Sequence, residues 1–214
     1  SVVQRYKDLE FKRPKYYVNT ILAEWTMDGE GRVYDGWEVI AKLGESPDFT
    51  VYGLDFGYGG TDSTSLIRVD YLEGAWYLTE MFSQPNMRMG EVVSKMKQLG
   101  IPLDARIYAD YAVPLFLTEI RLGGYKGIRK CKKGKVTEKV KLMQDKKIVV
   151  IDENKDSSLY FGYTTWAKNE KGKLPHEPDA LAASRYGILS CNPRTDKTSS
   201  RRVIKRKPRA KGYL

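Results

Sequence analysis

Three aspartates occupy positions where carboxylates could gather around a metal ion. Asp55 ends an apolar, β-prone segment and precedes a glycine-rich turn, where the backbone can approach a ligand closely. Asp110 ends a second apolar segment, and Asp179 lies in the first turn of a helical pattern, where the helix dipole favours its ionised form. Carboxylate clusters bind Mg2+ or Mn2+, and two such ions about 3.5–4 Å apart can activate a water for attack on a phosphodiester. The sequence therefore predicts a hydrolytic site in which these three residues bind two ions of Mg2+ or Mn2+.

Each aspartate also has a simpler interpretation. An Asp that ends a strand is most often a turn former, and an Asp that begins a helix is most often a cap. Their combination favours one shared site, in which cations would let neighbouring carboxylates stay ionised. His176 is the only histidine and precedes Asp179 by three residues, so it could bind a metal, orient a water or accept a proton. An incidental position is an equally good interpretation of a lone histidine.

The elements that must position these residues follow one another after residue 48. Glu73–Gly74 is a short hairpin signal between two β-prone segments. Three strands that look antiparallel, followed by alternating helices and strands, indicate an α/β fold, an RNase H-like mixed sheet with helices on both faces. The expected strands are 49–55, 65–72, 75–83, 105–110, 127–132 and 147–152, with a further aromatic, β-prone segment at 159–166, and the expected helices are 87–99, 115–122, 137–145 and 178–189.

The net charge of +10 is unevenly distributed along the chain. Residues 191–214 contain nine Lys/Arg and one acidic residue, and residues 126–147 contain ten Lys/Arg and two acidic residues. Each segment thus carries +8, which leaves −6 for the remainder. A mildly acidic body with two basic segments suggests a polyanionic partner. A solubilising tail and a solvated helix face would explain either segment alone.

Several classes of protein are disfavoured by the composition. No apolar run approaches the ~18 residues of a membrane span, and the first residues lack the apolar core of a signal peptide. Cys131 and Cys191 are the only cysteines, so they cannot build a zinc cluster between them and indicate free thiols in a reducing compartment. No G-x-x-x-x-G-K-[ST] motif occurs, so no P-loop is expected in these residues.

Five short motifs, in order, resemble the C-terminal part of the large terminases of tailed bacteriophages, from the inter-domain linker through the nuclease domain. The resemblance covers nearly everything from Tyr16 to Leu189. It departs from the family at Ala23, Ser63 and Pro175, where Gly, Pro and Asn are more usual, and after Lys135, where a Ser often follows. The motifs are Tyr17–Asn19 with Leu22–Trp25 and Glu30–Tyr34; Gly53–Tyr58 with Thr61–Thr64; Ala109–Ala112 with Glu119–Arg121; Lys132–Lys135; and His176 with Asp179–Ala180 and Arg185–Tyr186.

This resemblance implies a metal-dependent endodeoxyribonuclease that cuts concatemeric double-stranded viral DNA. It implies that His176 acts beside the three aspartates and that Lys132, Lys133 and Lys135 contact DNA. It divides the chain into the end of an inter-domain linker region at 1–48, a nuclease domain at 49–190, and a basic tail at 191–214 that has too few apolar residues to order in isolation. The implied partners are an ATPase domain outside this fragment, a small terminase subunit and the portal, in the host cell cytoplasm and away from membranes.

Two other classes remain open. A Holliday-junction resolvase or transposase of the same fold would use a similar carboxylate trio, although the linker-like segment at 19–34 argues against it. A non-catalytic DNA-binding protein would depend on the basic segments alone and would not cleave DNA in the presence of any metal.

Overall fold

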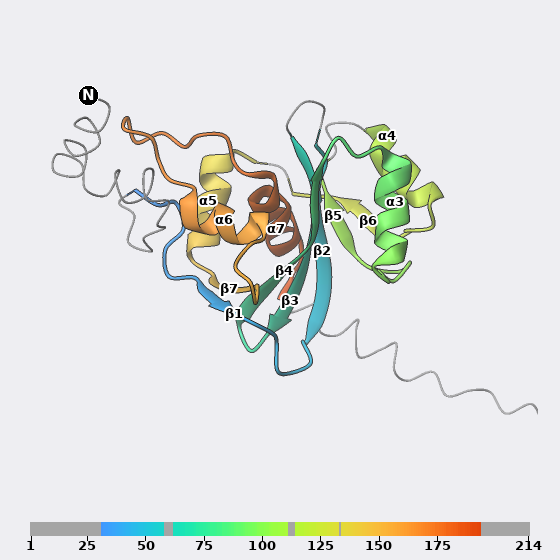
Figure 1. The fold of residues 1–214 in the computed structure, drawn as a ribbon, viewed down its shortest axis with the longest axis horizontal. Coiled ribbons are helices and arrows are strands. Elements are labelled where there is room, and N and C mark those ends of the chain that lie inside the picture. The colour runs from blue at the N-terminus through green and yellow to red at the C-terminus, as the bar shows by residue number, and fades with distance from the viewer. Residues whose placement is uncertain (1–30, 58–61, 111–113, 133, 194–214) are drawn as a thin grey trace, which may run out of the picture.

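Seven strands form one mixed sheet in the computed structural model, which describes residues 31–57, 62–110, 114–132 and 134–193 (Figure 1). The strands are β1 (Glu38–Ile40), β2 (Phe49–Asp55), β3 (Ser63–Leu72), β4 (Ala75–Pro85), β5 (Ile107–Ala109), β6 (Ile128–Lys130) and β7 (Lys147–Ile151). They lie in the order β1-β7-β4-β3-β2-β5-β6. The central strands β2, β3 and β4 pair antiparallel, and every other neighbouring pair is parallel. The sequence predicted this antiparallel centre.

The hairpin between β3 and β4 lies where the sequence placed it. Leu72 pairs with Ala75, so the loop contains only Glu73 and Gly74. Both have positive φ, 49° and 88°, as the type I′ turn of a two-residue hairpin requires. The register of two long neighbouring strands is therefore fixed by local sequence.

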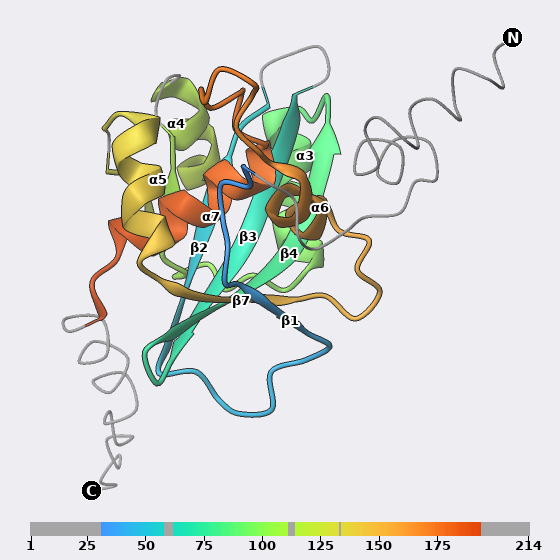
Figure 2. The same cartoon turned by 90° about the vertical axis from the view of Figure 1, so that its left-hand side faces the viewer.

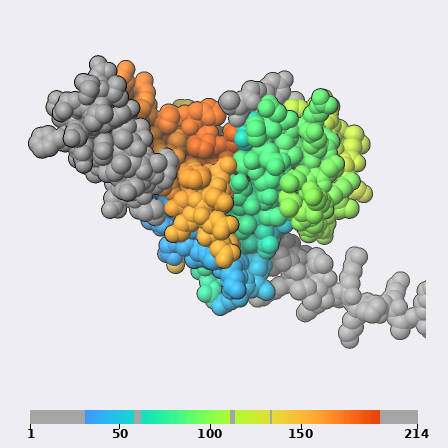
Figure 3. Space-filling view, viewed as in Figure 1, coloured from blue at the N-terminus to red at the C-terminus, as the bar shows by residue number. Residues whose placement is uncertain are grey.

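Helices cover both faces of the sheet, as the RNase H-like arrangement predicts (Figures 1 and 2). One face carries α3 (Met89–Gln98) and α4 (Pro114–Leu122), and the other carries α5 (Val136–Gln144), α6 (Ser158–Thr165) and α7 (Asp179–Ser190). Each face has its own cluster of buried apolar side chains. In the space-filling view, the orange segment that includes α6 and the green segment that includes α3 lie on opposite sides (Figure 3). Among the described residues, no helix combines the length and apolarity that a membrane crossing needs.

The aromatic segment 159–166 was expected to be β-prone, and this prediction is wrong, because α6 occupies it. The side chain of Ser157 caps the helix by accepting a hydrogen bond from the amide of Tyr160 at 3.0 Å. Leu159 and Tyr163 lie one turn apart and are both fully buried. A Cβ on Gly162 would lie 2.9 Å from the side chain of Leu181, so α6 packs closely on α7. Tertiary burial and a good cap thus override the β-propensity of the aromatic residues.

The residues before β2 add a strand that the sequence did not predict. β1 pairs in parallel with β7 at the edge of the sheet. Val33, Tyr34 and Trp37 are buried in the α5–α7 face, and the ring of Tyr34 lies 5.2 Å from that of Tyr163. The start of the nuclease domain at residue 49 remains a prediction, and this packing favours a start nearer residue 33.

Candidate active site

Asp55 and Asp110 meet because their strands are parallel neighbours. Leu54 of β2 pairs with Ala109 of β5, and each aspartate is the next residue along its strand direction. Both carboxylates therefore leave the sheet at the same edge, on adjacent strands about 4.8 Å apart.

Asp179 reaches this edge because α7 lies unusually close to β2. A Cβ on Gly53 would lie 1.8 Å from the carbonyl oxygen of Ala183 and 2.9 Å from the amide nitrogen of Gly187. Only glycine permits this approach of helix to strand. Since Asp179 begins α7 one turn before Ala183, and Asp55 lies two residues after Gly53, the start of the helix is brought to the end of the strand.

The first residue of β3 holds the Asp179 carboxylate in place. The amide of Ser63 donates a hydrogen bond to Oδ2 of Asp179 at 2.7 Å. Gly57 allows the chain to double back there, because a Cβ at that position would lie 2.3 Å from the carbonyl oxygen of Asp62. The amide of Gly57 also donates to Oγ1 of Thr64 at 3.2 Å. Ser63 thus positions a residue 116 positions away in sequence.

The electrostatics of Asp55 reflect the convergence of these carboxylates. Burial, followed by the charges of Asp179, Asp110 and Glu177, raises the pKa of Asp55 to about 8, against an opposing effect of Arg185. The ionised form is therefore disfavoured in the metal-free protein. A divalent cation would relieve this cost, because it replaces the proton as the partner of the carboxylate.

A cavity of about 560 Å³ opens beside these residues. Asp55, Asp179 and His176 line this cavity, and His176 is exposed. Asp110 is not part of the lining. Asp62, for which no role was predicted, is a further carboxylate in the lining. Within the described ranges, no three His, Cys, Asp or Glu side chains are arranged to hold a metal ion. Metal binding by Asp55, Asp110 and Asp179 stays a prediction, and the oxygen-only donor set and the raised pKa of Asp55 fit Mg2+ or Mn2+.

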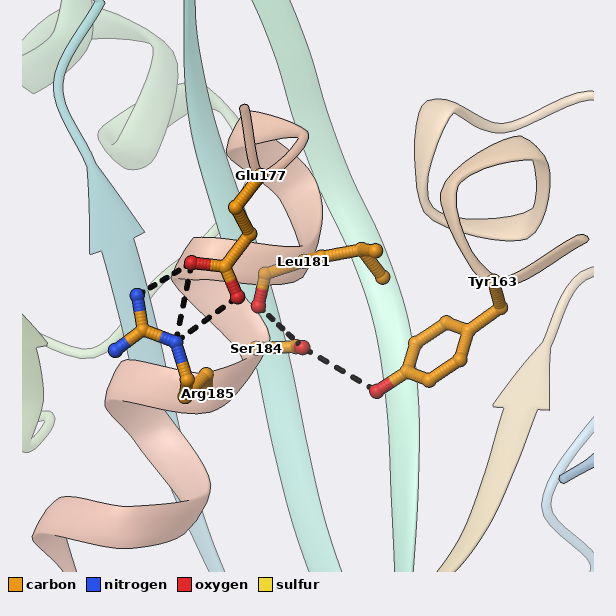
Figure 4. A network of polar contacts seen from close by, with 5 residues as sticks. All are labelled: Tyr163, Glu177, Leu181, Ser184 and Arg185. Atoms are coloured by element: carbon orange, nitrogen blue, oxygen red, sulfur yellow. Dashed lines mark hydrogen bonds and ion pairs between the residues drawn. The ribbon is translucent and has the colours of Figure 1, made fainter. Parts of the chain in front are cut away.

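A buried ion pair adjoining the site was missed by the sequence interpretation (Figure 4). Nε of Arg185 donates to both carboxylate oxygens of Glu177, at 2.9 and 3.1 Å, and its Nη2 makes a further contact. Both residues are buried and line the cavity. Burial alone would lower the pKa of Arg185, but the hydrogen bonds and charge of Glu177 hold it above its usual range. Because Glu177 lies between His176 and Asp179, the pair fixes the segment that carries both.

Arg185 is itself held from its other side. Its guanidinium carbon lies 4.7 Å from the centroid of the Tyr186 ring, which also lines the cavity. In the same helix, Ser184 donates to the carbonyl of Leu181 at 2.8 Å and its hydroxyl lies 3.4 Å from that of Tyr163 (Figure 4). The only sequence signal for this network was Arg185–Tyr186 in the last of the five motifs, and the partner of Arg185 could not be inferred from residue spacing.

Two of the three lysines expected to contact DNA can be placed in the structure. Lys132 and Lys135 are exposed, and Lys133 lies outside the described residues. The amide of Lys132 donates to Oγ of Ser190 at 3.0 Å, which attaches the turn to the end of α7. Lys135 is the N-cap of α5, and the next two residues line the cavity. The position is compatible with DNA contact, which remains a prediction.

Comparison with known proteins identifies solved structures with the same fold. No protein-family model matches the sequence, and no curated protein matches it. Solved structures do. The chain is similar to the large-terminase nuclease domain of bacteriophage SPP1 with bound Mn, with a TM-score of 0.61 and 18% identity, covering 72% of this chain and 96% of that one. It is similar to the P22 large-terminase nuclease domain, with a TM-score of 0.59 and 15% identity, covering 77% and 93%.

A third match is longer than this chain. The large terminase of a thermophilic bacteriophage aligns with a TM-score of 0.60 and 19% identity over 73% of this chain but only 44% of that one. Identities this low concern the fold. The chain therefore has the fold of the nuclease domains of bacteriophage large terminases, which the five motifs predicted.

Proposed function

We propose that this chain is the metal-dependent endonuclease domain of a phage DNA-packaging terminase and that it hydrolyses phosphodiester bonds of concatemeric double-stranded viral DNA. The observation that carries the proposal is the convergence of Asp55, Asp110 and Asp179 at one edge of a sheet of this fold. The Mn in the SPP1 nuclease domain supports a divalent metal as the cofactor.

In this proposal, Asp55, Asp110 and Asp179 hold two ions of Mg2+ or Mn2+. The ions would supply a water nucleophile and stabilise the charge that develops on the leaving oxygen. His176, exposed in the lining of the cavity, would orient that water or hold its proton. Ser63 keeps Asp179 directed toward the site through its amide. Lys132, Lys133 and Lys135 would contact the DNA backbone beside it.

The packaging context extends the proposal to partners. The longer terminase of the thermophilic bacteriophage, of which the match covers 44%, has been solved with ATP-γ-S and with ADP. We therefore expect an ATPase domain to accompany this one, with a small terminase subunit and the portal as further partners in the host cell cytoplasm.

Plasmid cleavage tests the proposed activity. Supercoiled plasmid incubated with the protein should be nicked and linearised with Mn2+ or Mg2+, remain intact in EDTA, and be cut without ATP. His176→Ala should lower the rate by about 10²–10⁴-fold, the usual range for acid–base assistance. DNA binding with no cleavage in any metal would indicate a non-catalytic DNA-binding protein, and a strong preference for branched DNA would indicate a resolvase.

A further inference from the structure

A second cavity, of about 490 Å³, adjoins the one that contains the carboxylates. The two share Thr137 and Leu174, so they form neighbouring parts of one depression. α5 makes one wall of the second cavity, and the segment before α7 makes the other. We call this second cavity the lysine groove, after Lys141, Lys168 and Lys173 in its lining.

The walls of the lysine groove are ordered structure. Thr137, Lys141 and Gln144 of α5 line it with the spacing of one helix face. In the opposite wall, Asn169 closes a turn: its Oδ1 accepts hydrogen bonds from the amides of Lys171 at 3.1 Å and Lys173 at 2.9 Å. The amide of Asn169 donates in turn to the carbonyl of Lys173 at 2.9 Å. The backbone that carries the lysines is thus fixed on both sides.

The charge of the lysine groove is of one sign. Its lining contains three lysines and no acidic residue. The three are exposed, and none forms an ion pair with another residue in the described part of the chain. The adjoining cavity has the opposite character, with Asp55, Asp62, Glu177 and Asp179 in its lining and Arg185 already paired to Glu177. A polyanionic substrate would be repelled by those carboxylates before metal binds, so its affinity must come from cations nearby.

We propose that the lysine groove binds the phosphate backbone of duplex DNA on one side of the scissile bond, a role that rests on the proposed nuclease function. From Thr137 to Gln144 the helix face extends about 10 Å at 1.5 Å per residue. DNA rises about 3.4 Å per base pair, so the groove spans about three nucleotides of one DNA strand. Lys141, Lys168 and Lys173 each contact a backbone phosphate in this arrangement, and the groove leads the strand from the carboxylates along α5.

The test measures binding of a short duplex in EDTA, where no cleavage occurs, across a salt series. The variant Lys141→Ala/Lys168→Ala/Lys173→Ala should flatten the slope of log K against log salt by about 2.7, since each phosphate contact contributes about 0.9. A matched control, Lys42→Ala/Lys97→Ala/Lys155→Ala, removes the same charge from exposed positions outside the basic segments and the groove, and should leave the slope near that of the parent. Replacement of the three groove lysines by arginine should retain the parental slope and check the fold.

Cleavage in Mn2+ separates this proposal from the nuclease proposal. The alanine variant should show a raised KM and an unchanged kcat at saturating DNA. A parental slope in the groove variant, or an equal flattening of the slope in the control, would overturn the proposed DNA-binding role of the lysine groove, even if cleavage is metal-dependent. Lysine-dependent binding by a protein that cleaves nothing would instead remove the nuclease function and leave the groove as a DNA-binding surface.

Discussion

The helices on the two faces of the sheet bury different kinds of residue. On one face, the buried side chains of α3 and α4 are all apolar: Met89, Val92, Met96, Leu117 and Ile120. On the other, α7 buries Ser184 and Arg185 in its interior turns, and Glu177 is buried just before it. Buried charge costs desolvation free energy that an apolar pair would not. The α3 and α4 face also buries a carboxylate, Asp70 of β3, but that one pairs with the partly exposed Arg68, whereas Glu177 and Arg185 are both buried beside the proposed chemistry.

The faces also differ in how closely their helices approach the strands. α7 packs against β2, β3, β4 and β5, and Gly53 and Gly187 bring its backbone against the central strand. α3 makes far less contact with the strands than α7 does, and Gly90 of α3 is exposed, with open space where a Cβ would be. Changes on the α7 face should therefore alter stability and activity together, whereas changes on the α3 face should alter stability alone.

The largest effect on stability should follow from breaking the buried ion pair. Glu177→Gln leaves Arg185 buried without a carboxylate, and the unfolding free energy should fall by about 3–5 kcal/mol. The double variant Glu177→Gln/Arg185→Met should recover much of this loss, because no uncompensated charge remains. Urea denaturation measures both. If Glu177→Gln is as stable as the parent, the buried ion pair does not contribute to the difference in stability between the two faces.

An apolar truncation on the other face should cost nearly as much stability without affecting the chemistry. Met96 of α3 is fully buried in the apolar cluster of that face, and Met96→Ala should lower the unfolding free energy by about 2–5 kcal/mol. Plasmid cleavage well below the melting temperature should keep its parental rate. Loss of cleavage by a folded Met96→Ala protein would show that the two faces are coupled.

Gly53→Ala should disturb the site through the backbone. Its Cβ would collide with the carbonyl of Ala183, which cannot rotate away as a side chain could. We expect a loss of about 3 kcal/mol, at the upper end for overpacking, together with a large loss of cleavage because α7 carries Asp179. Normal activity in this variant would mean that the close approach of α7 is unimportant for the site.

The pH dependence of stability should report on Asp55. Because its pKa rises from 3.8 in the unfolded chain to about 8 in the folded protein, the folded state holds a proton between these values that the unfolded state has lost. Stability in EDTA should therefore fall as the pH rises from about 4 to 8, by at most about 1.4 kcal/mol per pH unit from this group. Asp55→Asn should flatten the profile, and exposed Asp104→Asn should not. Identical profiles for the parent and Asp55→Asn would contradict the shift.

The smallest effect should come from the open glycine of α3. Gly90→Ala meets no atom within 4 Å and lies in a helix. It should stabilise the protein by about 0.4–1 kcal/mol, because alanine loses less backbone entropy on folding. Calorimetric melting measures the change, and a destabilised Gly90→Ala protein would contradict the open surroundings of this position.

Much of the fold could be predicted because its signals are local. The turn at Glu73–Gly74 and the apolar periodicity of the helices were readable in short windows. α6 could not be predicted in this way, because its aromatic residues become helical only when Leu159 and Tyr163 are buried on the face that carries α7. β1 was missed for a similar reason: a three-residue strand is defined by its partner β7 and has little pattern of its own.

The candidate site divides in the same way. The aspartates stand at the ends of elements, where strand direction and helix start can be inferred, and the structure brings Asp55, Asp110 and Asp179 to one edge. The Glu177–Arg185 pair depends on how the segment before α7 folds onto the helix, which no spacing rule gives. The lysine groove depends on the packing of α5 against a turn about 30 residues later.

Mn2+ binding measured by calorimetry tests the central claim, that Asp55, Asp110 and Asp179 form one metal site. The parent and Asp104→Asn, which changes an exposed carboxylate away from the cavity, should bind Mn2+ with the same affinity. Asp55→Asn, Asp110→Asn and Asp179→Asn should each bind it weakly or undetectably while remaining folded, because each removes an oxygen ligand. Parental Mn2+ affinity in all three variants, or no Mn2+ binding by the parent, would contradict the account.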